Sequence, residues 1–138
     1  MIPSTIDGVK VTAIGDMAFG GTGYSIKSAT IPDGVTSLGN CAFHECAITD
    51  ITMPASVTSM GPAVFMECPL KNVTFLGDQP SFEQFIPFWE IYNESFKITV
   101  MPNAKGFGKP EPYNNETSWN WTLPVPMVCN ITLRVSVY

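Results

Sequence analysis

The sequence predicts a β-rich solenoid, a short right-handed stack of coils joined by parallel strands. Residues 31–46 are matched 22 positions later by residues 53–68, and residues 11–19 are an earlier, partial copy. A repeat of about 20–29 residues is typical of solenoids, in which each repeat forms one coil. Each copy carries apolar residues that a single coil cannot bury, so neighbouring coils must stack to form a core.

The first element of each copy is a Val-Thr step that leads to a phenylalanine. Residues 35–39 and 57–61 read Val-Thr-Ser, then Leu or Met, then Gly, and each is followed by an Ala-Phe or Val-Phe pair. Residues at equivalent positions of stacked coils lie one above another. We therefore expect Phe43 and Phe65 to stack in the core one coil apart, with Phe19 beneath them.

The second element is a short strand. Residues 26–31, 48–53 and 70–75 all fit apolar-x-x-apolar-x-apolar, which is the strand segment of a leucine-rich repeat. Because side chains alternate along a strand, two ladders with a spacing of about 4.8 Å are expected on opposite faces. The inward ladder is apolar and consists of Ala29, Ile31, Ile51, Met53, Val73 and Phe75. The outward ladder consists of Thr30, Thr52 and Thr74.

The rest of the chain is predicted to close the stack. A last strand is expected near residues 97–101, and the aromatic stretch 82–92 is expected to cap the exposed core. Residues 130–138 alternate strictly and predict a strand that either pairs along an edge of the domain or begins a following one. The predicted organisation is leucine-rich repeats of about three coils over 1–77, a capping segment with a final strand over 78–108, and a strand-containing tail over 109–138.

The wording of the repeats is similar to one particular family. IPDGVTSLGNCAFHECAITDITMP (31–54) and VTAIGDMAFGG (11–21) resemble the BspA-like (Treponema pallidum type) leucine-rich repeats, over roughly residues 2–77. The resemblance implies a non-catalytic interaction or adhesion module of a cell-surface or secreted protein, with a protein or glycan partner on a host or neighbouring cell. Met1 precedes Ile2-Pro3, the phrase that opens each repeat, so we expect a fragment of a longer array.

Composition excludes several other classes. The 138 residues carry a net charge of −5, which argues against a nucleic-acid surface. No apolar run approaches the roughly 18 residues of a membrane span. We find no catalytic or phosphate-binding motif, and expect no enzyme activity and no cofactor. His44 is matched by Met66 in the next copy, which indicates a turn residue. Glu45 and Glu67 would stack as a like-charge pair, tolerable only if well exposed.

The four cysteines do not form a metal-binding pattern. Cys46 and Cys68 occupy equivalent positions, which favours a buried, unpaired ladder over a disulfide between them. The chain has no CxxC spacing and one histidine, which argues against a zinc site. Cys41 is expected to point outward, and Cys129 lies in the tail.

The candidate partner-binding residues are those that face outward along the three strands. They are Lys27, Ser28, Thr30, Thr49, Asp50, Thr52, Lys71, Asn72 and Thr74. The alternative is that this face contacts nothing and the threonines only favour strand formation. A different function is a carbohydrate-binding surface in which Trp119 and Trp121, on one strand face, stack on sugar rings, although they could equally pack on the solenoid. Asn-x-Ser/Thr glycosylation sequons begin at Asn72, Asn93, Asn115, Asn120 and Asn130.

Overall fold

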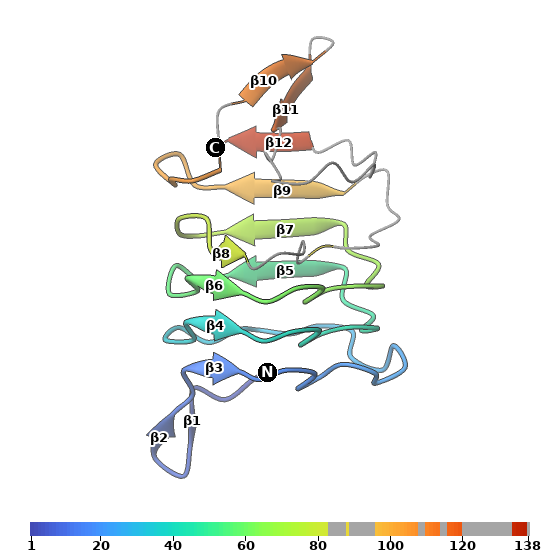
Figure 1. Ribbon diagram of the computed structural model, residues 1–138, viewed down its shortest axis with the longest axis vertical. Helices are drawn as coiled ribbons and strands as arrows, with labels where there is room; N and C mark the ends of the chain where they lie inside the picture. The colour runs from blue at the N-terminus through green and yellow to red at the C-terminus, as the bar shows by residue number, and fades with distance from the viewer. Residues whose placement is uncertain (83–87, 89–95, 108–109, 114–115, 120–133, 138) are drawn as a thin grey trace.

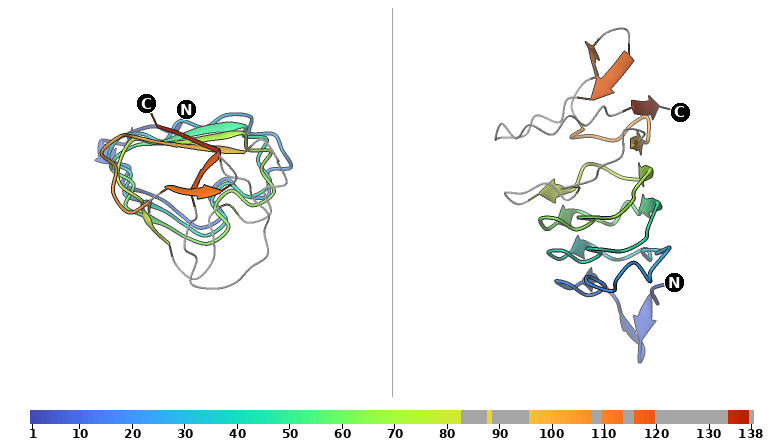
Figure 2. Two further views of the ribbon diagram at one scale, coloured as in Figure 1. Left: turned by 90° about the horizontal axis from the view of Figure 1, so that it is seen from above. Right: turned by 90° about the vertical axis from the view of Figure 1, so that its right-hand side faces the viewer.

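The computed structural model is a short β-solenoid whose coils stack along one axis (Figure 1). It describes residues 1–82, 88, 96–107, 110–113, 116–119 and 134–137, and of these residue 82 and the last three ranges as backbone only. These residues contain no helix, and so no helix long and apolar enough to cross a membrane. Viewed along the axis, the successive coils lie over one another (Figure 2).

Two parallel ladders run along opposite sides of the stack (Figures 1 and 2). The longer strands belong to a six-stranded sheet in the order β10-β11-β12-β9-β7-β5. Its parallel members are β5 (Asp50–Met53), β7 (Asn72–Phe75), β9 (Lys97–Val100) and β12 (Arg134–Val137). In this register Asp50 pairs with Asn72, which pairs with Lys97. The strand expected near residues 97–101 is therefore confirmed as β9.

The second sheet is built from the Val-Thr steps. It has the order β3-β4-β6-β8 and comprises β3 (Ala13–Ile14), β4 (Ser37–Leu38), β6 (Ser59–Met60) and β8 (Ser81–Phe82), all parallel. Hydroxyl groups reinforce it, because Thr58 donates to the carbonyl of Thr36 at 3.3 Å and Thr36 donates to that of Thr12 at 3.1 Å. The partial copy at residues 11–19 is thus in register with the two full copies.

Two antiparallel elements flank the stack. At the N-terminus β1 (Thr5–Ile6) and β2 (Val9–Lys10) form a hairpin. Its turn is Asp7-Gly8, and both residues have positive φ, as the tight turns that match strand twist require. At the other end β10 (Pro110–Tyr113) pairs with β11 (Glu116–Trp119), which pairs with β12. The strand predicted at the C-terminus is β12, and it continues the sheet beside β9.

A column of phenylalanine rings forms the centre of the core. Phe19 stacks on Phe43 with ring centroids 5.3 Å apart, and Phe43 stacks on Phe65 at 5.4 Å with an interplanar angle of 4°. The column does not end there, because Phe88 lies on Phe65 at 5.8 Å and 8°. Phe88 is 3% exposed and belongs to the predicted aromatic cap. The predicted stack is confirmed, and β8, Phe88 and β9 extend it by a further coil.

The first copy of the strand segment differs from the prediction. Ile31 is buried and Ile26 and Ala29 pack against the core, but residues 26–31 form no strand. Ala29 stands where the next coils have Ile51 and Val73, and alanine is a weak strand former with little surface to pack on its neighbours. The residues 26–31 therefore follow the path of the other coils without joining the β5 ladder.

The cysteine ladder is confirmed. Cys46 and Cys68 are buried and unpaired, and each thiol donates to a carbonyl of the preceding coil, Cys46 to Phe19 at 3.3 Å and Cys68 to Phe43 at 3.0 Å. Burial raises the pKa of both thiols, that of Cys68 to about 12. Cys41, expected to point outward, is instead half-buried, and Cys129 lies outside the described residues.

Candidate partner-binding face

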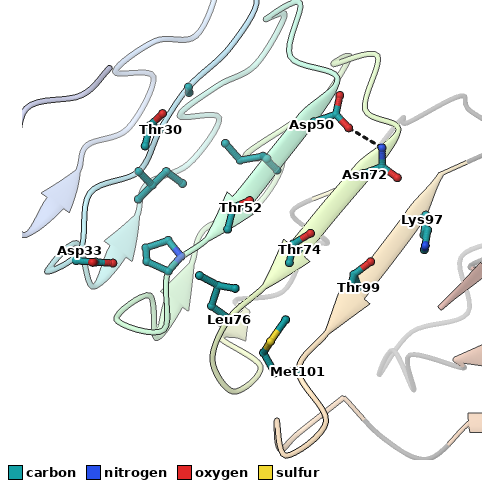
Figure 3. Close-up of a pocket in the computed structure, with 14 residues that line it drawn as sticks. Thr30, Asp33, Asp50, Thr52, Asn72, Thr74, Leu76, Lys97, Thr99 and Met101 are labelled. Carbon is teal, nitrogen blue, oxygen red and sulfur yellow. Dashed lines mark hydrogen bonds between the residues drawn. The ribbon is translucent and has the colours of Figure 1, made fainter. Parts of the chain in front are cut away.

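The outer face of β5, β7 and β9 carries three rows of side chains that run across the strands (Figure 3). The alternation of a strand turns every second residue outward, and the in-register pairing aligns those residues between coils. The polar row is Asp50, Asn72 and Lys97. The threonine row is Thr30, Thr52, Thr74 and Thr99. The apolar row follows the strand ends and consists of Pro54, Leu76 and Met101.

Hydrogen bonds organise the polar row. The Asn72 amide donates to the Asp50 carboxylate at 2.5 Å, and the Thr49 hydroxyl donates to its other oxygen at 2.6 Å. The bond from Thr49, then that from Asn72, and the charge of Lys71 hold the pKa of the Asp50 carboxyl below its usual value. The row thus presents a fixed carboxylate at one end and, two strands away, the amine-bearing side chain of Lys97.

The threonine row changes from exposed to buried along the stack. Thr30 and Thr52 are exposed, Thr74 is half-buried and Thr99 is 8% exposed. Beside it, Leu76 is 45% exposed and adds apolar surface to the face. The three rows line one depression with a volume of about 670 Å³. It offers charge, hydroxyl groups and apolar surface within a single concavity.

Five of the nine residues predicted for this face line the depression, and four do not. The lining includes Thr30, Asp50, Thr52, Asn72 and Thr74. Thr49 and Lys71 directly precede β5 and β7, and Lys27 and Ser28 lie in the segment 26–31, which forms no strand. None of these four residues lines the depression. No observation tests whether any of the nine contacts a partner, so their role stays a prediction.

Sequence reasoning missed the contributions of the fourth coil and of the strand ends. Lys97 and Thr99 continue the two outer rows, and the alternation within residues 97–101 was the signal that could have located them. Leu76 and Met101 were missed because the prediction followed the outward positions within the strands, and both residues come directly after a strand. The depression therefore extends beyond the residues predicted for this face, and one side of it is apolar.

The two residues of the predicted carbohydrate-binding surface lie where the structure describes no side chain. Trp119 is the last residue of β11, of which only the backbone is described, and Trp121 lies outside the described residues. Among the sequons, Asn72 is exposed in β7 with its amide engaged by Asp50. The other four, at Asn93, Asn115, Asn120 and Asn130, lie outside the described residues.

Comparison with known proteins agrees with the repeats and the stacked coils. A family model described as a BspA type leucine rich repeat region, with six copies, matches residues 11–103. The chain belongs to this family. The match covers most of the chain and extends through β9, which pairs with β7 in the outer sheet. The comparison with curated proteins and the comparison with solved structures each found no match.

Membership of the BspA-type family indicates a repeat-based protein-interaction module. In a stack of this kind the outward strand residues are free to differ from coil to coil, because the core depends only on the inward ones. The outer rows illustrate this: Asp50, Asn72 and Lys97 are chemically unlike, whereas the inward residues Ile51, Val73 and Ile98 are all buried aliphatic side chains.

Proposed function

We propose that the chain is an adhesion module of a surface or secreted protein, and that it binds a protein partner in the depression over β5, β7 and β9. The observation that carries the proposal is the alignment of the polar, threonine and apolar rows in one concavity. Protein interfaces combine apolar and polar contacts, and this face offers both within reach of a single partner segment.

The partner is expected to bring one apolar anchor and a ring of polar groups. Leu76 and Met101 offer the apolar contact at one side, and methionine adapts its shape readily to different partners. Asp50 and Lys97 favour opposite charges on the partner at the other side. The arrangement fits a protein segment better than a sugar, because none of the described residues that line the depression carries an aromatic ring for stacking.

Binding by one module should be weak. The four coils that contribute to the face, at a spacing of about 4.8 Å, span only about 15 Å of partner surface. Interfaces below about 1,200 Å² are typical of weak and transient encounters. A working adhesin would therefore gain strength from several copies or a longer array, through avidity rather than new contacts.

A matched pair of variants tests the proposal. The full chain and the variants Thr74→Arg and Thr5→Arg would be displayed multivalently and passed over purified extracellular-matrix and plasma proteins by surface plasmon resonance. Thr74 lies in the middle of the threonine row, whereas Thr5 is exposed in the β1–β2 hairpin. We expect Thr74→Arg to weaken binding by about tenfold or more, because the large side chain fills the depression. Thr5→Arg should leave it unchanged.

Two outcomes would contradict the proposal. One is equal binding by wild type and Thr74→Arg, with both variants folded by circular dichroism. The other is absence of protein binding together with glycan-array binding that Trp119→Ala abolishes, which would move the function to the carbohydrate alternative.

A further inference from the structure

A second cluster of functional side chains lies away from the outer strands, in the turns that follow the phenylalanine column. His44 and Glu45 come directly after Phe43, and Glu67 occupies the position of Glu45 in the next coil. Glu45 and Glu67 both have positive φ, 55° and 59°, a backbone conformation that residues other than glycine adopt at a cost. The Glu45 N–H donates to the carbonyl of Met66 at 3.0 Å, which ties the two turns together.

The turns bring one ring nitrogen and two carboxylates together. One donor atom from each of His44, Glu45 and Glu67 lies within 4.8 Å of the other two. His44 Nε2 is 3.8 Å from Glu67 Oε1, too far for a hydrogen bond. Both glutamates are half-buried, whereas the sequence suggested that such a like-charge pair would be tolerated only if well exposed. Two carboxylates this close repel each other unless a cation lies between them.

The His44 side chain provides a second, independent observation that points to a ligand. Its side chain is 17% exposed, and Nε2 itself is shielded from solvent and has no hydrogen-bond partner. Buried polar atoms in native proteins nearly always have a partner, and a bound ion or a water is one explanation of an exception. Nε2 faces Glu67, so the missing partner belongs between the imidazole and the carboxylates.

The geometry points to a divalent transition-metal site formed by His44, Glu45 and Glu67, with zinc as the best-suited ion. One imidazole nitrogen with carboxylate oxygens is a donor set that zinc accepts, whereas calcium and magnesium prefer oxygen alone. Zinc bonds of about 2.0–2.2 Å in tetrahedral geometry need donor atoms about 3.3–3.6 Å apart. The Glu67 side chain is 38% exposed, so it can rotate the short distance that closes the cluster.

Such a site would join two consecutive coils and leave coordination positions open to water. Three protein ligands are one fewer than a closed structural zinc site contains. The sequence argued against zinc from the absent CxxC spacing and the single histidine. That reasoning overlooked Glu67, which lies far from His44 in sequence and reaches it only because the coils stack.

Isothermal titration of the full reduced chain with zinc chloride tests the site. We expect one saturable zinc equivalent in wild type. Glu67→Gln keeps the shape of the side chain and removes the charge, and His44→Met introduces the residue that Met66 already provides in the next coil. Changing a residue that only supports a metal ligand weakens metal binding roughly 10–100-fold. Because these two variants replace ligands themselves, each should weaken zinc binding by more than that. Asp7→Asn, an exposed change in the β1–β2 turn, is the control and should bind like wild type.

The single histidine gives a direct second readout. Its ring-nitrogen NMR signals need no assignment, and saturating zinc should shift the Nε2 resonance of His44. The site is ruled out if zinc leaves that resonance unchanged, or if Glu67→Gln and His44→Met bind as tightly as wild type, which would place the ion on the thiols or elsewhere. Because the NMR measurement uses wild type, it decides the question even if a variant fails to fold.

Discussion

Phe88 stacks on Phe65 almost parallel, with ring centroids 5.8 Å apart and an interplanar angle of 8°. The geometry repeats that of Phe43 on Phe65, although residues around Phe88 do not resemble the repeat. Phe88 also meets Phe75 edge-on at 6.5 Å and Phe96 at 5.7 Å. The core column therefore continues by one ring beyond Phe65.

Removing that ring should destabilise the chain about as much as removing one from the middle. Phe88→Ala and Phe43→Ala should each lower the free energy of unfolding by about 3–5 kcal/mol, since both side chains are nearly fully buried. Phe88→Leu keeps much of the apolar volume and should cost less. Urea denaturation followed by tryptophan fluorescence measures all three, and a near-neutral Phe88→Ala would show that the column ends at Phe65.

The glycines that follow the β3, β4 and β6 strands set how closely coils approach. A Cβ on Gly39 would lie 2.5 Å from the backbone nitrogen of Asp16 in the coil below, whereas one on Gly15 would meet nothing within 4 Å. Gly39→Ala should therefore cost about 1–3 kcal/mol of stability through overpacking. Gly15→Ala, at the same repeat position in the terminal coil, should change stability by less than about 1 kcal/mol. Equal effects in thermal melts would mean that the coils do not stack in this register.

The buried thiols should make the chain sensitive to alkali. Burial raises the pKa of Cys68 from 9.0 to about 12, so above pH 9 the unfolded chain releases the thiol proton while the folded chain keeps it. The resulting stabilisation is complete below pH 9 and is lost as the pH rises to about 12, at no more than about 1.4 kcal/mol per pH unit. Urea midpoints of wild type should fall more steeply between pH 8.5 and 10.5 than those of Cys68→Ala.

Alkylation provides the control for that experiment. Cys46 and Cys68 should resist iodoacetamide in the native protein and react after denaturation without reductant, because both are buried and unpaired. A Cys46–Cys68 disulfide peptide in the mass spectrum would refute the free ladder.

Reversing the charges at Lys27, Asp50 and Lys71 should leave folding intact. All three side chains are exposed, and surface substitutions of this kind usually change stability by no more than about 0.5 kcal/mol each. Of the three only Asp50 lines the depression, so Asp50→Lys alone should reproduce most of any loss of partner binding. If the Lys27 and Lys71 changes cause the loss of partner binding instead, the partner also contacts these two lysines outside the depression.

The repeat spacing was enough to predict the fold wherever the residues themselves repeat. The Phe19–Phe43–Phe65 column, the two ladders and the unpaired cysteines all follow from equivalent positions lying over one another. Prediction was incomplete at both ends of the array. Residues 26–31 have the strand pattern but form no strand and pair with no other coil. Phe88 joins the phenylalanine column, although the residues around it lack the repeat pattern.

The candidate sites were harder to predict because they depend on contacts between coils. Leu76 and Met101 form an apolar row only once β7 and β9 are paired. His44 seemed unimportant because Met66 replaces it in the next copy, yet its neighbour is Glu67 rather than its own counterpart. Comparing equivalent positions of the repeats identifies the core residues. Contacts between non-equivalent positions of neighbouring coils, such as that of His44 with Glu67, are seen only in the structure.

Oxidative footprinting of the free and partner-bound chain tests the proposed binding face most directly. Hydroxyl radicals report the exposure of methionine and leucine side chains, and Leu76 and Met101 line the depression. Met17, which is 50% exposed and outside the depression, serves as an internal reference. The proposed binding face predicts that a bound protein protects Leu76 and Met101 while Met17 is oxidised as before. Unchanged oxidation of Leu76 and Met101 in a saturated complex would contradict it.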